Sequence, residues 1–186
     1  MTRRTFLKTG AVIAAGPGIA LSRTSVVKAA LAIDTSQIQA TVPANFTGLS
    51  YEAAQLAHPD FFSSSNKRLA AFVRTLGARG VLRIGGNTSE FTVWSPQGAS
   101  AAVTGAVGPD TGRKIHRSYP ITSKAIRNLA AFVEAVDWQL IYGLNLGKGT
   151  PEQAAREAKA VSDATGRRLL EFQIGNEPDL FHRNGL

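Results

Sequence analysis

The sequence contains no cysteine, and it has only three histidines and one methionine among its 186 residues. Without cysteine, disulfide bonds, thiolate nucleophiles and thiolate metal sites are excluded. The three histidines, His58, His116 and His182, lie far apart and show none of the spacings at which histidines share a metal ion. After the N-terminus, no apolar run reaches the roughly 18 residues that a transmembrane helix needs. We therefore expect no metal, no other cofactor and no membrane span in the mature chain.

Basic residues outnumber acidic ones, but the excess is concentrated at the N-terminus. The chain has 21 Lys and Arg against 13 Asp and Glu, a formal net charge of +8. Residues 1–32 hold five of the basic residues and no acidic one, which leaves the remainder with a net charge of +3. The remaining charges are scattered and form no basic stripe interleaved with aromatic residues. This pattern does not indicate nucleic-acid binding.

The first 32 residues have the order of parts found in an export signal. Arg3-Arg4 is a twin arginine in a basic segment, an apolar stretch of small residues covers 9–21, and Ala30-Leu31-Ala32 provides an A-x-A cleavage site. The alternative is a basic N-terminus before a buried helix, but Pro17-Gly18 would break such a helix. We predict a twin-arginine signal peptide over 1–32 and a periplasmic or extracellular location.

After the signal, segments typical of strands alternate with segments typical of helices. The expected strands cover 46–52, 81–86, 138–144 and 169–175. The expected helices begin near Ser65, Ser123 and Thr150, and the last has the Thr-Pro-Glu-Gln pattern of a capping box. The stretch 87–122 contains several Gly and Pro residues and is expected to be a loop or an insertion.

Strands that alternate with helices predict a parallel sheet joined by right-handed crossovers. In the last strand, Leu170, Phe172 and Ile174 point to one side, and polar or small residues point to the other. The strand at 81–86 alternates in the same way. One apolar face under helices and one mixed face are typical of a barrel wall, whereas an open doubly wound sheet is more often apolar on both faces. We predict an α/β fold that forms strands 1–4 of a (β/α)8 TIM barrel.

Functional residues of such barrels lie where the strands end. Here the strand ends carry polar residues, and they read Ser50-Tyr51-Glu52, Gly85-Gly86-Asn87, Asn145 and Asn176-Glu177-Pro178. Three motifs that include the last three of these ends, Leu82–Phe91, Tyr142–Asn145 and Phe172–Phe181, resemble those of glycoside hydrolase family 79. That family contains β-glucuronidases and heparanase-like enzymes. The resemblance covers residues 46–181.

The resemblance implies that O-glycosidic bonds are hydrolysed with retention, a reaction that needs two carboxyl groups about 5–5.5 Å apart. It gives Glu177 the acid/base role, Asn176 a hydrogen bond to a sugar hydroxyl, and Arg83 a pairing with the nucleophilic glutamate. Further candidates for substrate binding, with loop capping as the alternative, are Asn145, Asn87, Glu52 and Tyr51. Trp94 is expected either to stack on a sugar or to pack in the core.

The resemblance places the nucleophile on a seventh strand, which this sequence does not include, and it gives neither Glu52 nor Glu90 that role. A whole barrel takes about 250 residues, and residues 33–186 number 154. We therefore expect 46–186 to be a partial catalytic domain that is inactive alone and needs a C-terminal half. Residues 33–45, with a strand over 37–42, are expected to be a β segment of an accessory β-sandwich.

Three other interpretations remain open. The chain could be a glycosidase of another family in the same clan, one acting on arabinofuranosides or xylans. It could be an exported remnant that binds carbohydrate without hydrolysing it. In the leading interpretation the expected partner is a carbohydrate, namely a uronic-acid glycoside or a related oligosaccharide. A nucleotide-binding sheet has little support, because no G-x-G-x-x-G follows a strand.

Overall fold

The structure is a computed structural model that describes residues 34, 36–37, 40–98, 118–183 and 186. The chain divides into two compact units, Met1–Ala40 and Thr41–Leu186. In the first unit, the Asp34 carboxylate accepts hydrogen bonds from the backbone and the hydroxyl group of Ser36. The predicted signal peptide lies outside the described residues.

The predicted β segment over 33–45 is only partly described. Residue 37 and residues 40–42 belong to no strand, and Ala44 and Asn45 form a turn. The Val42 side chain is 64% exposed. A strand needs a paired neighbour for its backbone groups, and none accompanies residues 40–42 within the described part of the chain. Residues 37 and 40–42 thus form no strand here, and the assignment of 33–45 to an accessory β-sandwich stays a prediction.

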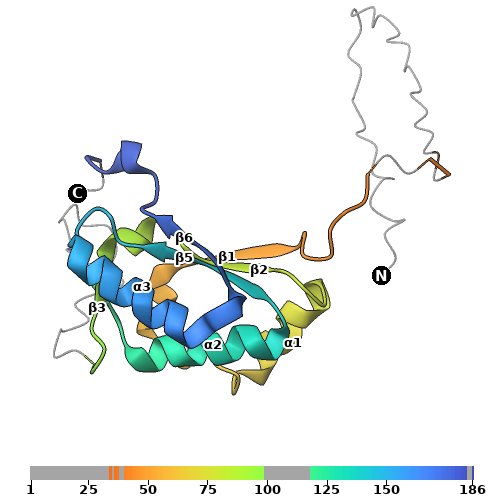
Figure 1. Ribbon diagram of the computed structural model, residues 1–186, viewed down its shortest axis with the longest axis horizontal. Coiled ribbons are helices and arrows are strands. Elements are labelled where there is room, and N and C mark those ends of the chain that lie inside the picture. The colour runs from red at the N-terminus through yellow and green to blue at the C-terminus, as the bar shows by residue number, and fades with distance from the viewer. Residues whose placement is uncertain (1–33, 35, 38–39, 99–117, 184–185) are drawn as a thin grey trace, which may run out of the picture. The chain divides into compact units, whose positions relative to one another are not determined.

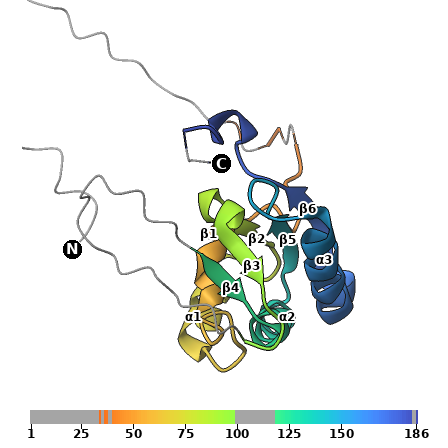
Figure 2. The same cartoon turned by 90° about the vertical axis from the view of Figure 1, so that its left-hand side faces the viewer.

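The second unit contains a four-stranded parallel sheet with three α-helices. The strands are β1 (Gly48–Glu52), β2 (Val81–Gly85), β5 (Gln139–Leu144) and β6 (Leu169–Ile174), in the order β1-β2-β5-β6. The helices α1 (Lys67–Leu76), α2 (Ser123–Val136) and α3 (Pro151–Thr165) connect them and cover one face (Figures 1 and 2). The predicted α/β fold with a parallel sheet is confirmed. None of the helices in the described ranges has the length and apolar character needed to cross a membrane.

Each α-helix begins at a side chain that caps its first turn. Asn66 accepts a hydrogen bond from the amide of Leu69, and Thr122 accepts one from the amide of Ala125. These caps lie one residue after and one residue before the predicted positions. Thr150 forms the predicted capping box, because its hydroxyl and the side chain of the third helical residue satisfy each other's backbone amides.

The hydrophobic core lies between the helices and the covered face of the sheet. From the sheet it contains Leu82, Ile84, Leu140 and Tyr142, all at most 1% exposed. The open face carries side chains in alternation with these, including Ser50, Arg83 and Gln173, which meet in the site described below. The predicted alternation of the strand at 81–86 is therefore confirmed.

The edge strand β6 departs from the prediction. Leu170 and Ile174 are 49% and 68% exposed, and Leu169 and Phe172 pack against the core instead. The pairing register explains part of this result, because Leu140 lies opposite Leu169 while Ile141 lies opposite Glu171. Leu170 is the extra residue of a β-bulge, so the alternation predicted over 169–175 does not hold at its start.

The predicted loop over 87–122 contains regular structure on both sides of residues 99–117, which are not described. After the short 3-10 helix η2 (Asn87–Phe91), strand β3 (Thr92–Trp94) pairs in parallel with β4 (Tyr119–Ile121). Figure 2 shows this pair beside the main sheet. Trp94 packs against the core, the second of its two expected roles. The other 3-10 helices are η1 (Ala53–Ala57), η3 (Gly166–Arg168) and η4 (Pro178–Leu180).

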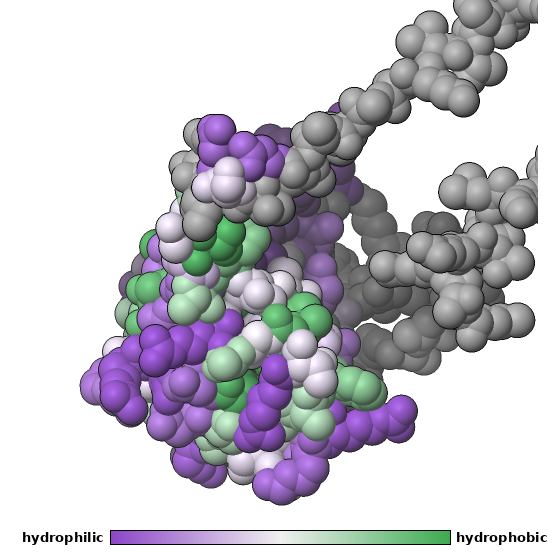
Figure 3. All heavy atoms as spheres, turned by 90° about the vertical axis from the view of Figure 1, so that its right-hand side faces the viewer, coloured by the Kyte–Doolittle hydropathy of each residue, from purple (hydrophilic) through white to green (hydrophobic). Residues whose placement is uncertain are grey.

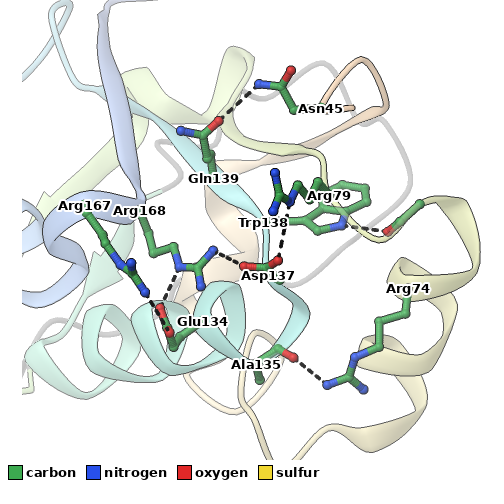
Figure 4. Close-up of polar contacts among 11 residues, drawn as sticks. Asn45, Arg74, Arg79, Glu134, Ala135, Asp137, Trp138, Gln139, Arg167 and Arg168 are labelled. Atoms are coloured by element: carbon green, nitrogen blue, oxygen red, sulfur yellow. Dashed lines mark hydrogen bonds and ion pairs between the residues drawn. The ribbon is translucent and has the colours of Figure 1, made fainter. Parts of the chain in front are cut away.

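Ion pairs join the elements at the side where the strands begin (Figure 4). Arg168 donates hydrogen bonds to Glu134 and Asp137 at the end of α2, and this lowers the pKa of both carboxyl groups. Arg74 donates to the carbonyl of Ala135, in the last turn of α2. The Trp138 ring, 0% exposed, donates from its indole nitrogen to the carbonyl of Gly77 at 3.1 Å. These contacts hold the end of α2 against α1 and against the residues that directly precede β6.

The same side of the molecule holds a cavity of about 440 Å³, lined in part by Arg79, Arg168 and Asp137. Figure 3, which views the side where the strands begin, shows hydrophilic side chains beside smaller hydrophobic areas. Two of the lining charges already neutralise each other, because Arg168 is bonded to Asp137. The cavity is far from the polar strand ends, and we assign no chemistry to it.

Candidate active site

A cluster of polar side chains connects three strands at the open face of the sheet. Arg83, in the middle of β2, donates from Nε to Gln173 Oε1 at 2.7 Å, from Nη1 to Ser50 Oγ at 2.8 Å and from Nη2 to Asn176 Oδ1 at 2.9 Å. Its three acceptors come from β1, β6 and the turn that follows β6. The guanidinium group is thus held in one orientation, with neutral oxygens on all three of its nitrogen atoms.

Asn176 links this arginine to the end of β2. Its Oδ1 accepts from Arg83, and its Nδ2 donates to Asn87 Oδ1 at 2.8 Å. Its backbone amide donates to Glu90 Oε1 at 2.7 Å. The Asn176 side chain and backbone are therefore fixed by partners from two sides, and its amide group has a defined orientation.

Glu90 is a buried carboxylate that binds backbone amides. The side chain is 1% exposed, and besides the amide of Asn176 it accepts from the amides of Leu146 at 2.9 Å and Gly147 at 2.6 Å. Hydrogen bonds to a charged carboxylate are about twice as strong as neutral ones. One side chain thereby ties together the segments that follow β2, β5 and β6.

The Glu52 side chain accepts hydrogen bonds from Thr88, which lies just after the end of β2. Its Oε2 accepts from the backbone amide of Thr88 at 2.9 Å and from the Thr88 hydroxyl at 2.7 Å. Gly86 has a φ of +75°, and a Cβ atom at that position would collide with the Glu52 carboxylate. Gly86 is therefore explained by close approach of the β2 turn to Glu52, whereas a Cβ atom at Gly85 would come within 3.2 Å of the Arg83 guanidinium.

Glu177 lies in a left-handed backbone conformation at the end of β6, with φ 48° and ψ 60°. It lies two residues after Gly175, whose φ is +73°. A positive φ is uncommon for glutamate and costs about 1 kcal/mol or more. The side chain is exposed, and within the described residues it takes part in no hydrogen bond or ion pair. Such outliers occur where the surroundings fix the backbone, often at functional sites.

The structure thus brings together Arg83, Asn176 and Asn87, with Glu177 next to Asn176 in the chain. It adds three residues that sequence reasoning did not assign to the site, Ser50, Gln173 and Glu90. The alternation of β1 and β6 places Ser50 and Gln173 on the same face as Arg83. Glu90 has no comparable signal, because its partners are backbone amides.

Two predicted substrate-binding residues lie elsewhere. Tyr51 is on the helix-covered face, in edge-to-face contact with Phe61 at 5.8 Å and Phe62 at 5.2 Å between ring centroids. Side chains alternate along a strand, so Tyr51 points away from its neighbours Ser50 and Glu52. The Tyr51 ring therefore lies away from the Arg83 cluster, and its part in substrate binding stays a prediction.

Asn145 has the loop-capping role that was the alternative to sugar binding. It is 8% exposed, it donates to the carbonyl of Thr92 at 2.9 Å, and its Oδ1 accepts from the amides of Lys148 and Gly149. These contacts hold the loop between β5 and α3 against β3. The Asn145 side chain therefore caps this loop, and its part in substrate binding stays a prediction.

A second buried carboxyl group lies behind the sheet. Glu157 of α3 is 3% exposed and accepts a hydrogen bond from the Tyr142 hydroxyl at 2.6 Å. Burial raises the pKa of Glu157 to about 7, although the Tyr142 hydrogen bond opposes this shift. Burial and the adjacent carboxyl group raise the pKa of Tyr142. This pair is separated from the site by the sheet. Among the described residues, no group of three or more His, Asp or Glu side chains is placed to bind a metal.

The chain thus combines an α/β fold, built on a parallel sheet, with a polar cluster where the strands end. The cluster contains Arg83 and Asn176, and Glu177 follows Asn176 in the chain. No protein-family model matches the chain. A curated β-glucuronidase of Aspergillus niger is 29% identical over 136 residues, which cover 69% of this chain and 24% of that protein. The chain therefore spans about a quarter of the length of the curated relative that it matches.

The fold is also similar to a solved structure. The crystal structure of a 4-O-α-L-rhamnosyl-β-D-glucuronidase from Fusarium oxysporum 12S, in complex with Rha-GlcA, superposes with a TM-score of 0.52 and 16% identity. The match covers 72% of this chain and 28% of that one. At this identity the likeness concerns the fold. The chain is thus similar in sequence to one glucuronidase and in fold to another.

Proposed function

We propose that this chain is the amino-terminal part of a retaining β-glucuronidase of the family 79 type, and that Glu177 is its acid/base. In this proposal β1, β2, β5 and β6 are the first four strands of an eight-stranded barrel. The similarity to two glucuronidases and the position of Asn176-Glu177 at the end of β6 support it. The chain covers about a quarter of its relative, and in this proposal the nucleophile lies on a further segment.

The observation that carries the proposal is that Arg83 has neutral hydrogen-bond acceptors and, among the described residues, no carboxylate partner. A guanidinium group has five N–H donors, and the three bonds described here go to neutral oxygens. Within the described part of the chain, no carboxylate forms an ion pair with Arg83. A partly buried arginine favours an anionic partner with fork geometry. The nucleophilic carboxylate of the absent segment would supply that charge next to Glu177.

The mechanism assigns one task to each described group. Protonated Glu177 donates its proton to the glycosidic oxygen while the nucleophilic carboxylate attacks the anomeric carbon and the aglycone leaves. Ionised Glu177 then removes a proton from water, which attacks the same carbon and releases the sugar. Asn176 Nδ2 donates one hydrogen to Asn87, and its second hydrogen is directed to a sugar hydroxyl. Arg83 holds the Asn176 side chain and the nucleophile in position.

A chimera tests the proposal. This chain replaces the matched segment of the Aspergillus niger β-glucuronidase, and turnover of 4-nitrophenyl β-D-glucuronide is measured with Glu177 and with Glu177→Gln. Loss of a general acid and base lowers kcat by about 10²–10⁴-fold. The matched control is Asp179→Asn, an exposed acid two residues away, which is expected to keep activity. A folded chimera whose activity is the same with Glu177→Gln would contradict the proposal.

Export by the twin-arginine pathway is a separate proposal. It rests on the order of the parts in residues 1–32. Fused to a reporter that folds before export, residues 1–32 are expected to direct it out of the cytoplasm in a strain with the twin-arginine translocase and not in a strain without it. Export that persists after Arg3→Lys and Arg4→Lys together would overturn this proposal.

A further inference from the structure

We infer that Glu90 is a positioning residue, which holds the turn that presents Glu177. The inference rests on the proposed role of Glu177 for its meaning in catalysis. The contacts from which it is argued are independent of that role.

The geometry around Glu90 joins three loops through one carboxylate. Oε1 accepts from the amide of Asn176 at 2.7 Å, and Oε2 accepts from the amides of Leu146 at 2.9 Å and Gly147 at 2.6 Å. Glu90 itself sits in η2, directly after β2. The Glu90 side chain is 1% exposed, so its carboxylate oxygens are shielded from water and are available to these amides. Removing the carboxylate would leave three backbone donors without a partner in a largely enclosed place.

The bond to Asn176 acts on the residue before Glu177. Gly175 and Glu177 both have positive φ, of 73° and 48°; glycine adopts such values readily, whereas they are uncommon for glutamate. Arg83 and Asn87 hold the Asn176 side chain, whereas among the described residues it is Glu90 that binds its backbone amide. Glu90 therefore holds the backbone of Asn176 in place, next to the left-handed residue Glu177.

These contacts also exclude a direct chemical role for Glu90. Both of its oxygens accept hydrogen bonds from the backbone, and it is enclosed beneath the loops. A nucleophile needs an oxygen that reaches the anomeric carbon, and an acid/base needs one that reaches the glycosidic oxygen. Glu90 offers neither, so it acts through the turn.

Amide hydrogen exchange, measured by NMR on the whole purified chain, distinguishes this role from a general contribution to stability. Glu90→Gln is expected to speed the exchange of the Leu146, Gly147 and Asn176 amides by about 10-fold or more, since it replaces charged hydrogen bonds by weaker ones. The amides of Trp138 and Gln139, at the other side of the sheet, keep their protection. The matched control is Glu157→Gln, the same change at another buried carboxyl group, which leaves the three loop amides unchanged.

The backbone of Glu177 provides the second readout. In Glu90→Gln, the Cα and Cβ chemical shifts of Glu177 are expected to move away from their left-handed values, whereas Glu157→Gln leaves them in place. Unchanged exchange at the three amides, equal acceleration throughout the chain, or unmoved Glu177 shifts would each overturn the inference. If Glu90→Gln does not fold, Glu90→Asp is measured instead. Its shorter side chain cannot reach all three amides, and full protection of all three would contradict the role.

The outcome is independent of the proposed reaction. The exchange experiment needs no substrate and no activity, so an inactive chimera leaves it readable. Conversely, unchanged loop amides would remove the role of Glu90 and leave the acid/base assignment of Glu177 untouched.

Discussion

The two ends of the parallel sheet are built in different ways. Where the strands begin, a buried Trp138 and the ion pairs of Arg168 with Glu134 and Asp137 join helices to strands. Where the strands end, Arg83 is held by neutral oxygens, and Glu90 is buried against backbone amides. Among the described residues, two that are not glycine have a positive φ: Asp137 lies at the first end and Glu177 at the second.

These two left-handed residues show what the difference means. Asp137 ends α2, and its carboxylate is bonded to Arg168, so its unusual backbone belongs to a contact that stabilises the fold. Glu177 makes no such contact in the described part of the chain. A strained residue with an unused side chain is a cost to stability that function can explain. The start of the sheet is therefore scaffold, and its end is the candidate site.

A substitution of a buried residue where the strands begin should have the largest effect on stability. Trp138→Ala removes a fully buried ring and its hydrogen bond to Gly77, and is expected to lower the free energy of unfolding by about 3–5 kcal/mol. Urea unfolding followed by circular dichroism measures this. The control is Trp94→Ala, which removes a partly buried ring and should cost less. Equal losses from the two variants would contradict the assignment of Trp138 to the main scaffold.

The carboxyl group behind the sheet predicts a dependence on pH. Burial raises the pKa of Glu157 from 4.5 to about 7, so between these values the folded chain binds more protons than the unfolded chain. The free energy of unfolding therefore falls as the pH rises through this window, by about 3 kcal/mol in all. Glu157→Gln should flatten the profile and be more stable than the original chain above pH 7. Parallel profiles for the two proteins would show that Glu157 does not titrate in this way.

The sequence predicts much of the scaffold because its signals are local. The pattern from Thr150 to Gln153 specifies a helix start through contacts three residues apart, and the structure has this capping box. The alternation around Arg83 places that side chain on the open face. The bulge at Leu170 could not be predicted in this way, because it is a feature of pairing with β5 and not of β6 alone.

The site is less predictable for a related reason. Asn176 and Asn87 follow strand ends and could be named from the sequence. Tyr51 also follows that pattern, but the aromatic residues Phe61 and Phe62 lie under the other face and give its ring a place in the core. The role of Glu90 depends on loops that come together only in the fold.

The ion pairs of the scaffold side should contribute less than its buried ring. Arg168→Met is expected to lower the melting temperature by roughly 2–4 °C, because both carboxylate partners are largely exposed to water. The difference should shrink in 1 M NaCl, which screens exposed charges. A loss that stays the same at high salt would indicate packing by the arginine stem in place of ion pairing.

The smallest expected effect is a gain at the site. Asn tolerates a left-handed backbone better than glutamate, so Glu177→Asn should raise the free energy of unfolding by about 0.5–1 kcal/mol. Asp179→Asn, at a position without positive φ, is the control and should be neutral. Destabilisation by Glu177→Asn would mean that the Glu177 side chain supports the fold.

Rescue by azide tests the acid/base assignment most directly. In the chimera with Glu177→Gln, the glycosyl-enzyme intermediate lacks the base that activates water, and azide, which needs no base, can attack the anomeric carbon instead. The account predicts that sodium azide restores turnover of 4-nitrophenyl β-D-glucuronide and that the product is the β-glucuronosyl azide. A folded Glu177→Gln chimera that turns over at the original rate, or a slow one that azide does not accelerate, would contradict it.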